Sequence, residues 1–283
     1  MAQKTKIKGR KELIAGVAVL SVILVVLLVV AFGLFKGVPA EFAAMGILPQ
    51  ETQAGPEENP YGPEDFRFEG QAAQLVSGGG TLGIDVSDHQ GDIDWQQVAE
   101  AGVDFAMIRI GYRGYGKGTG NIVADSHARA NYQGAKENGI RVGVYFFSQA
   151  ISPVEVMEEA RFVLDAIRDW EIDMAVVYDW EYVKDTARTA HINAHQLTAY
   201  SRIFCTVMKE KGYDTMVYFN RHQAARRLKL GELEEFPFWL AMYQQEMNYP
   251  YKVEMWQYTD SGKIPGIEGN VDLNILLPGW KEK

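Results

Sequence analysis

Cysteine is almost absent from this chain of 283 residues. Cys205 is the only one, so no internal disulfide is possible, and its apolar, helix-like surroundings indicate a core residue. A folded domain must then depend on a large hydrophobic core rather than on cross-links. The five histidines include no cluster with zinc-ligand spacing, and no loop has the regularly spaced acids of a calcium site. The sequence therefore predicts neither a metal site nor a cofactor.

Positive charge is scarce beyond the first 36 residues. Residues 1–36 hold six Lys or Arg and one acid, a net charge of +5, so residues 37–283 carry −14 and the whole chain −9. Because phosphate binding needs clustered Lys and Arg, this excess of acid argues against nucleic acid as a partner. The glycines of residues 111–120 lack the order of a phosphate-binding loop, which also argues against a bound nucleotide.

One long apolar run stands out, the uncharged stretch of 23 residues at 13–35. That length is enough to cross a bilayer of about 30 Å as a helix. The Lys and Arg residues of the basic tail, 1–12, predict a cytoplasmic N-terminus, a single pass through the cell membrane and an extracellular remainder. A cleaved signal peptide with a cleavage site at Val38-Pro39-Ala40 is the alternative, although its apolar core would span only about 7–15 residues.

Residues 36–80 show no apolar period and are rich in Pro, Gly, Glu and Gln. A segment of this composition buries too little apolar surface to fold alone. The sequence therefore predicts a flexible linker that holds the following domain away from the membrane.

From residue 81 to residue 283, short β-branched and aromatic runs alternate with longer amphipathic segments. This alternation favours an α/β fold with a parallel sheet, and eight strands favour an irregular TIM-like (β/α) barrel. The irregularity is expected near the end, where connections 244–252 and 259–270 are too short or too rich in Gly and Pro for full helices. Strands are predicted at 82–86, 105–110, 141–147, 175–179, 215–219, 238–243, 253–258 and 271–276, and helices at 93–102, 125–139, 152–170 and 193–212.

Two carboxylates end the fourth predicted strand, Asp179 and Glu181 in MAVVYDWE (174–181). Residues i and i+2 of a strand point to one face, roughly 6.6 Å apart, and paired carboxylates carry out glycosidic bond hydrolysis. A pair of solvated acids at a strand end is the alternative. Since catalytic groups of such barrels lie at strand ends, Asp85 in the first strand and Asp272 in the eighth are expected to join them.

Aromatic residues near the predicted strand ends are expected to offer flat faces to sugar rings, with ordinary barrel packing as the alternative for each. The candidates are Tyr112, Tyr145, Phe147, Tyr218, Tyr243, Trp256 and Tyr258.

Six motifs follow one another between residues 82 and 278. They are GIDVSDHQGDIDW (83–95), DFAMIRIGY (104–112), GIRVGVYFFSQA (139–150), VVYDWE (176–181), FWLAMY (238–243) and WQYTDSGKIPGIEGNVDLN (256–274). In this order they resemble glycoside hydrolase family 25, the Chalaropsis-type lysozymes. The resemblance implies an irregular α/β barrel that cleaves the β-1,4 bond between N-acetylmuramic acid and N-acetylglucosamine in peptidoglycan.

The resemblance also implies roles for the four acids. Glu181 is expected to be the general acid/base, Asp179 to orient or stabilise the N-acetyl group of the substrate, and Asp85 and Asp272 to support them. One departure is Phe146, where many members carry His or Tyr, and a side chain facing the cleft there would alter substrate preference.

These observations predict a membrane-anchored muramidase, with residues 81–283 as its catalytic barrel and peptidoglycan glycan strands as its partner. Two alternatives stay open. One is a non-catalytic module that binds peptidoglycan, and the other is an assembly protein of a wall-spanning complex.

Overall fold

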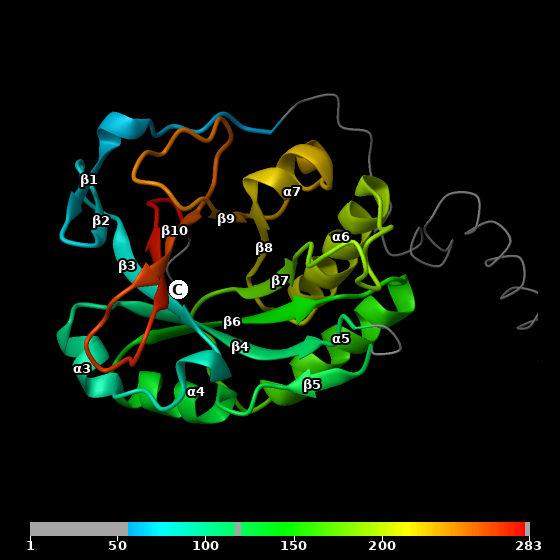
Figure 1. Ribbon diagram of the computed structural model, residues 1–283, viewed down its shortest axis with the longest axis horizontal. Helices are drawn as coiled ribbons and strands as arrows, with labels where there is room; N and C mark the ends of the chain where they lie inside the picture. Colours follow the sequence, from blue (N-terminus) through cyan, green and yellow to red (C-terminus); the bar gives the residue numbers. More distant parts are fainter. Residues whose placement is uncertain (1–55, 117–119, 281–283) are drawn as a thin grey trace, which may run out of the picture. The chain divides into compact units, whose positions relative to one another are not determined.

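The computed structural model describes residues 56–116 and 120–280 (Figure 1). The predicted basic tail and the predicted membrane span, residues 13–35, lie outside these residues. Within the described ranges, none of the helices combines the length and the apolar character needed to cross a membrane.

Eight strands close into a barrel because the first, β3, pairs with β4 on one side and with the last, β11, on the other. Each of the eight predicted strands overlaps one of them, so the predicted α/β barrel is confirmed. In order around the barrel they are β3 (Thr81–Val86), β4 (Phe105–Arg113), β6 (Arg141–Ser148), β7 (Val176–Trp180), β8 (Thr215–Asn220), β9 (Phe238–Ala241), β10 (Met255–Gly262) and β11 (Val271–Leu276).

The last strand, β11, is antiparallel to both of its neighbours, β10 and β3, whereas the other barrel strands pair in parallel. The expectation of a parallel sheet is therefore wrong for β11, at the end of the barrel where irregularity was expected. A parallel connection needs a crossover of about a dozen residues or more, and residues 263–270 are too few. The reversal places the start of β11 at the same end of the barrel as the carboxyl ends of the parallel strands.

Helices cover the outside of the barrel along β4, β6, β7 and β8 (Figure 1). The four predicted helices are confirmed as α3 (Trp95–Glu100), α4 (Ala128–Glu137), α5 (Pro153–Ala166) and α6 (Ala194–Glu210). Asp94, Ser152 and Asn193 cap α3, α5 and α6 by accepting hydrogen bonds from backbone N–H groups of the first turn. Helices α4 and α5 pack on β4 and β6, and α6 packs on β7 and β8. The sequence did not predict the short strand β5 (Ile122–Ala124), which pairs with β4, or the short helix α7 (Arg221–Arg226).

Part of the predicted linker is folded, so that prediction is wrong for residues 63–75. A 3-10 turn (Pro63–Asp65) leads into an antiparallel hairpin of β1 (Phe66–Glu69) and β2 (Ala72–Leu75). The two-residue loop between them has Gly70 at φ +60°, which suits the first central position of a type II′ turn. The rings of Phe66 and Phe68 lie 5.2 and 6.4 Å from the Trp256 ring, which attaches the hairpin to the barrel.

The interior of the barrel is apolar at the end where the parallel strands begin. Phe105, Met107, Met216, Met255 and Leu276 meet there in one buried cluster. Each of these side chains shares the inner face of its strand with polar residues two or four positions away, nearer the other end. The barrel therefore has an apolar floor below a polar mouth.

A glycine in β3 makes room for this floor. Gly83 is paired with Phe105 of β4, and a Cβ atom on Gly83 would lie 2.2 Å from the Phe105 ring. We expect Gly83→Ala to lower the free energy of unfolding by about 1–3 kcal/mol, because the ring must shift in a packed core. Urea unfolding followed by tryptophan fluorescence measures the change. The penalty should shrink when alanine is introduced into a Phe105→Leu background, and an equal penalty in both backgrounds would contradict the steric explanation.

Candidate active site

The carboxyl ends of the parallel strands surround a cavity of about 250 Å³ at the mouth of the barrel. All four acids predicted from the sequence line it, each from its predicted strand. The lining residues are Asp85, Ser87, His89, Gln90, Arg109, Tyr145, Phe147, Asp179, Glu181, Tyr218, Trp239, Tyr243, Gln257 and Asp272.

The acids meet for two reasons: alternate residues of a strand point to the same face, and β11 pairs with β3. Asp179 and Glu181, two positions apart at the end of β7, both reach the cavity, while Trp180 between them is buried and does not line it. Asp272 of β11 lies directly opposite Asp85 of β3 in the register of the two strands. Directly opposed residues have Cβ atoms about 4.5–5.5 Å apart, so these two carboxyl groups are close neighbours.

Two buried amides hold Asp85 in place. The Nε2 group of Gln257 and the Nδ2 group of Asn274 both donate hydrogen bonds to Asp85 Oδ2, at 2.7 and 2.8 Å. Burial raises the pKa of Asp85 to about 6, and the two amide hydrogen bonds oppose that rise. Asp85 is therefore mostly ionised at neutral pH, although it is buried.

The orientation of both amides follows from their other partners. The indole N–H of Trp239, which can only donate, lies 2.8 Å from Asn274 Oδ1, so the Asn274 nitrogen faces Asp85. Likewise Gln257 Oε1 accepts from the hydroxyl groups of Tyr218 and Tyr243, at 2.9 and 3.1 Å. One network thus connects the charged acid to two tyrosines of the cavity wall.

Glu181 is half-buried at the rim of β7. Burial and, after it, the negative charge of Asp85 raise the pKa of Glu181 to about 7. A carboxyl group with this pKa holds its proton in about half of the molecules at neutral pH, which is the property that a general acid requires.

Asp179 is buried, with 5% of its surface exposed. Burial, then the charges of Glu181 and Asp85, raise the pKa of Asp179 well above its ordinary value, against the opposing charge of Arg109. Its Oδ1 atom is buried, and no donor in the described part of the chain reaches it. Because an unpaired buried polar atom is costly, this oxygen is suited to accept a hydrogen bond from a bound molecule.

Asp272 and Arg109 complete the charged part of the cavity. Burial, then the charges of Asp85, Asp260 and Glu181, raise the pKa of Asp272 to about 8. The guanidinium group of Arg109 lies at hydrogen-bond distance from Asp88 and Asp125, which fixes it beside the acids.

The structure places some of the aromatic candidates in the cavity wall and others away from it. Tyr145, Phe147, Tyr218 and Tyr243 line the cavity. Trp256 does not, because its neighbour Gln257 faces the cavity and Trp256 points to the opposite face of β10, where its Nε1 donates to the Met242 carbonyl.

Two further aromatic candidates, Tyr112 and Tyr258, lie outside the cavity, and so does Phe146. The Tyr112 ring lies 5.3 Å from the Arg109 guanidinium, past an irregularity in the β4–β6 register, and Tyr258 lines a different pocket. Phe146 packs against Phe162 of α5 and does not line the cavity.

Several cavity residues were not predicted from the sequence: Ser87, His89, Gln90, Arg109, Trp239 and Gln257, together with Asn274 behind them. For some of these residues the sequence did contain a signal, namely their closeness to a predicted acid. Gln90 and its neighbours follow Asp85 within one motif, and Asn274 is two positions from Asp272, on the same face of its strand.

Residues 84–267 match the sequence model of glycosyl hydrolases family 25. The chain belongs to this family. Three of the four acids, Asp85, Asp179 and Glu181, lie within the matched residues, and Asp272 lies just beyond them.

Two lysozymes are similar to the chain over most of the barrel. An autolytic lysozyme of Clostridium acetobutylicum is 28% identical over 198 residues, which are 70% of this chain and 56% of that protein. Lysozyme M1 of Streptomyces globisporus is 26% identical over 249 residues, which are 82% of this chain and 76% of that protein.

Among solved structures, the modular autolysin LytC of Streptococcus pneumoniae superposes with a TM-score of 0.63 at 25% identity, over 75% of this chain and 52% of LytC. LytC has also been solved in complex with a synthetic peptidoglycan ligand. A lysozyme of Streptomyces coelicolor superposes with a TM-score of 0.53 at 25% identity, over 70% of this chain and 92% of that protein. The chain thus spans little more than half of the clostridial lysozyme and of LytC.

The electrostatics of this family 25 site are open to direct measurement. In Asp85→Asn the pKa of Glu181 should fall below its wild-type value of about 7, because the Asp85 charge is one of the two causes that raise it. Carboxyl-labelled NMR titration of the chain measures this pKa. Asp260→Asn is the matched control, since the Asp260 charge acts on Asp272. An unchanged Glu181 pKa in Asp85→Asn would show that the two groups do not interact.

Proposed function

We propose that this chain hydrolyses the β-1,4 bond between N-acetylmuramic acid and N-acetylglucosamine in peptidoglycan. The observation that carries the proposal is the convergence of four carboxyl groups in one cavity, with one acid mostly ionised and another close to half-protonated at neutral pH. Two carboxyl groups with pKa values set apart by their surroundings are the working groups of glycoside hydrolysis. The lysozymes and autolysins among its relatives support the same substrate class.

Glu181 acts as the general acid. It gives its proton to the glycosidic oxygen while the bond from that oxygen to the anomeric carbon breaks, and its carboxylate later accepts a proton from the water that adds to that carbon. The ionised Asp85 favours the protonated form of Glu181 before the reaction. During bond cleavage the same negative charge stabilises the positive charge that develops on the sugar ring.

Asp179 positions the substrate. Its unpaired Oδ1 accepts a hydrogen bond from the N–H of the substrate acetamide group, which supplies the partner that this buried atom lacks. Tyr218 and Tyr243, whose hydroxyl groups are bound to Gln257, present their rings to the sugars. Asp272 adds to the negative field around Glu181 when it is ionised.

The first test is turnover. Incubation of the full-length protein with purified cell walls should release reducing muramic ends, and Glu181→Gln should lower the rate by about 10²–10⁴-fold, the usual contribution of a general acid. Glu137→Gln, at an exposed position on α4, is the control and should leave the rate unchanged. If the wild-type protein binds walls but releases no ends at any pH, a peptidoglycan-binding module is the better assignment.

We further propose that residues 13–35 anchor the protein in the cell membrane, with the N-terminus cytoplasmic and the barrel outside. The support is the uncharged run of 23 residues after a basic tail. An anchored hydrolase would cut the wall close to the membrane, and such local cutting suits a partner in a wall-spanning protein complex.

The anchor has its own test. The full-length protein should stay with the membrane fraction after a high-salt wash, whereas a variant without residues 1–36 should appear in the soluble fraction and keep its activity. Protease added outside intact protoplasts should degrade the barrel of the full-length protein. A mature N-terminus near Glu41 would instead indicate a cleaved signal peptide.

A further inference from the structure

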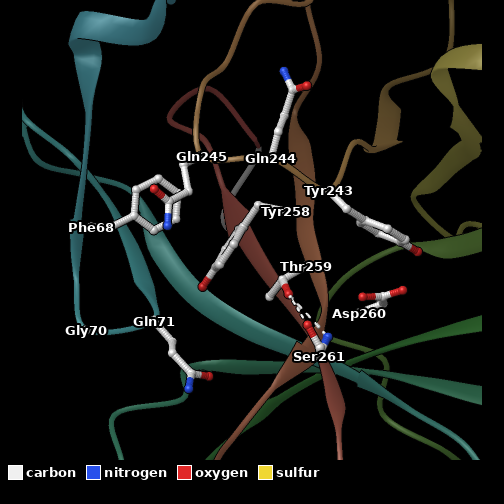
Figure 2. Close-up of a pocket in the computed structure, with 10 residues that line it drawn as sticks. All are labelled: Phe68, Gly70, Gln71, Tyr243, Gln244, Gln245, Tyr258, Thr259, Asp260 and Ser261. Carbon is white, nitrogen blue, oxygen red and sulfur yellow. Dashed lines mark hydrogen bonds between the residues drawn. The ribbon is translucent and has the colours of Figure 1, made fainter.

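A second pocket, of about 500 Å³, lies next to the catalytic cavity and shares Tyr243 with it. Its wall comes from three separate segments of the chain: the β1–β2 hairpin, the segment after β9, and the second half of β10. The residues that line it are Phe68, Gly70, Gln71, Tyr243, Gln244, Gln245, Tyr258, Thr259, Asp260 and Ser261 (Figure 2).

One wall of this pocket comes from a segment outside the residues that match family 25. The hairpin residues Phe68, Gly70 and Gln71 lie before the residues that match family 25, 84–267. The hairpin is nevertheless held firmly on the barrel. The Phe68 ring lies 5.6 Å from the Tyr258 ring, and the backbone N–H of Ala73 donates to the Tyr258 hydroxyl at 3.3 Å.

The amide of Gln71 is also fixed in orientation. Its Oε1 accepts a hydrogen bond of 2.7 Å from the backbone N–H of Lys263, so its NH₂ group remains as the donor. Gln71 thus ties the hairpin loop to the β10–β11 connection at the edge of the pocket.

The chemistry of the lining selects an uncharged ligand. Of the described residues that line the pocket, Asp260 is the only one that carries a charge. An acidic ligand, such as a stem peptide with free carboxylates, would meet this negative charge and no opposite one. The remaining residues offer aromatic rings together with amide and hydroxyl groups. Such a combination suits a sugar, whose ring has apolar C–H faces and whose hydroxyl and acetamide groups form hydrogen bonds.

The pocket is close enough to the acids to belong to the same binding cleft. Tyr243 is half-exposed between the two, with its hydroxyl group bound to Gln257 of the catalytic network. Asp260, on the same side of the pocket as Tyr243 in Figure 2, contributes to the raised pKa of Asp272. A glycan chain that leaves the catalytic cavity past the Tyr243 ring therefore enters this pocket.

We propose that the pocket binds an uncharged N-acetylhexosamine residue of a glycan strand, while the neighbouring sugars of the same strand occupy the catalytic cavity. The hairpin thus lengthens the cleft and makes binding depend on the number of sugars. This inference rests on the proposed function for the identity of the strand.

The experiment measures binding apart from turnover. The full-length Glu181→Gln protein is titrated calorimetrically with linear β-1,4-linked N-acetylglucosamine oligomers of two and six residues. Adding Gln71→Ala and Gln245→Ala, both at exposed positions, should weaken binding of the hexamer about three- to tenfold, as the loss of one or two hydrogen bonds predicts. The ratio of hexamer to dimer affinity should fall with it. Gln133→Ala, at an exposed position on α4, is the matched control and should change neither affinity.

Several outcomes would overturn the inference. They are a hexamer that binds no more tightly than the dimer, a hexamer affinity that the double substitution does not change, and a loss confined to wall fragments that carry stem peptides. Unchanged unfolding midpoints show that the variants are folded. Failure of the proposed function is seen separately, as an absence of reducing ends released from walls by the wild-type protein, and it leaves the binding result standing.

Discussion

Closure of the sheet, combined with the two-residue period of each strand, is the constraint on which the rest of this molecule depends. In a closed barrel every second side chain must enter the interior, and the interior is filled from one end to the other. The strands meet this requirement by placing apolar residues early and polar residues late on the inner face, as Met107 and Arg109 do in β4 and Met255 and Gln257 do in β10. The residues of the cavity are thus the upper layer of the packing that holds the barrel together.

The reversed last strand is the step that completes the site. Its short connection from β10 forces the antiparallel direction, and so Asp272 enters the mouth at the start of β11 while Leu276 reaches the apolar floor at its end. The pairing of β11 with β3 then sets Asp272 against Asp85. The N-terminal hairpin packs on the outer face of β10. Together with the second half of β10 it forms part of the wall of the second pocket.

The sequence was sufficient for the eight barrel strands and for the positions of the acids, because β-branched runs and a carboxylate pair at a strand end are local signals. The sequence was insufficient to predict which residues of each strand face the interior of the barrel. Barrel strands are buried on both faces, so VEMWQY shows no regular alternation of apolar and polar residues and does not reveal that Gln257 faces inward and Trp256 outward. The hairpin was missed for a related reason: Phe66 and Phe68 pack against aromatic rings of β10, about 190 positions further along the chain, and composition cannot indicate such contacts.

The amides also decide which acid carries which charge. Asp85 is buried, yet its pKa rises only to about 6, because Gln257 and Asn274 donate to it. Glu181, without such donors among the causes of its shift, reaches about 7. A carboxyl group whose pKa is raised on folding stabilises the folded state fully below its unfolded pKa. That stability is lost as pH rises through the folded pKa, for Glu181 between about pH 4 and 7. The site therefore opposes folding at neutral pH, and the apolar floor beneath it offsets this effect. Removal of the amide donors would raise the pKa of Asp85, so that Asp85 would hold a proton at neutral pH in more of the molecules. Two neutral residues thus help to keep the pKa of Asp85 below that of Glu181.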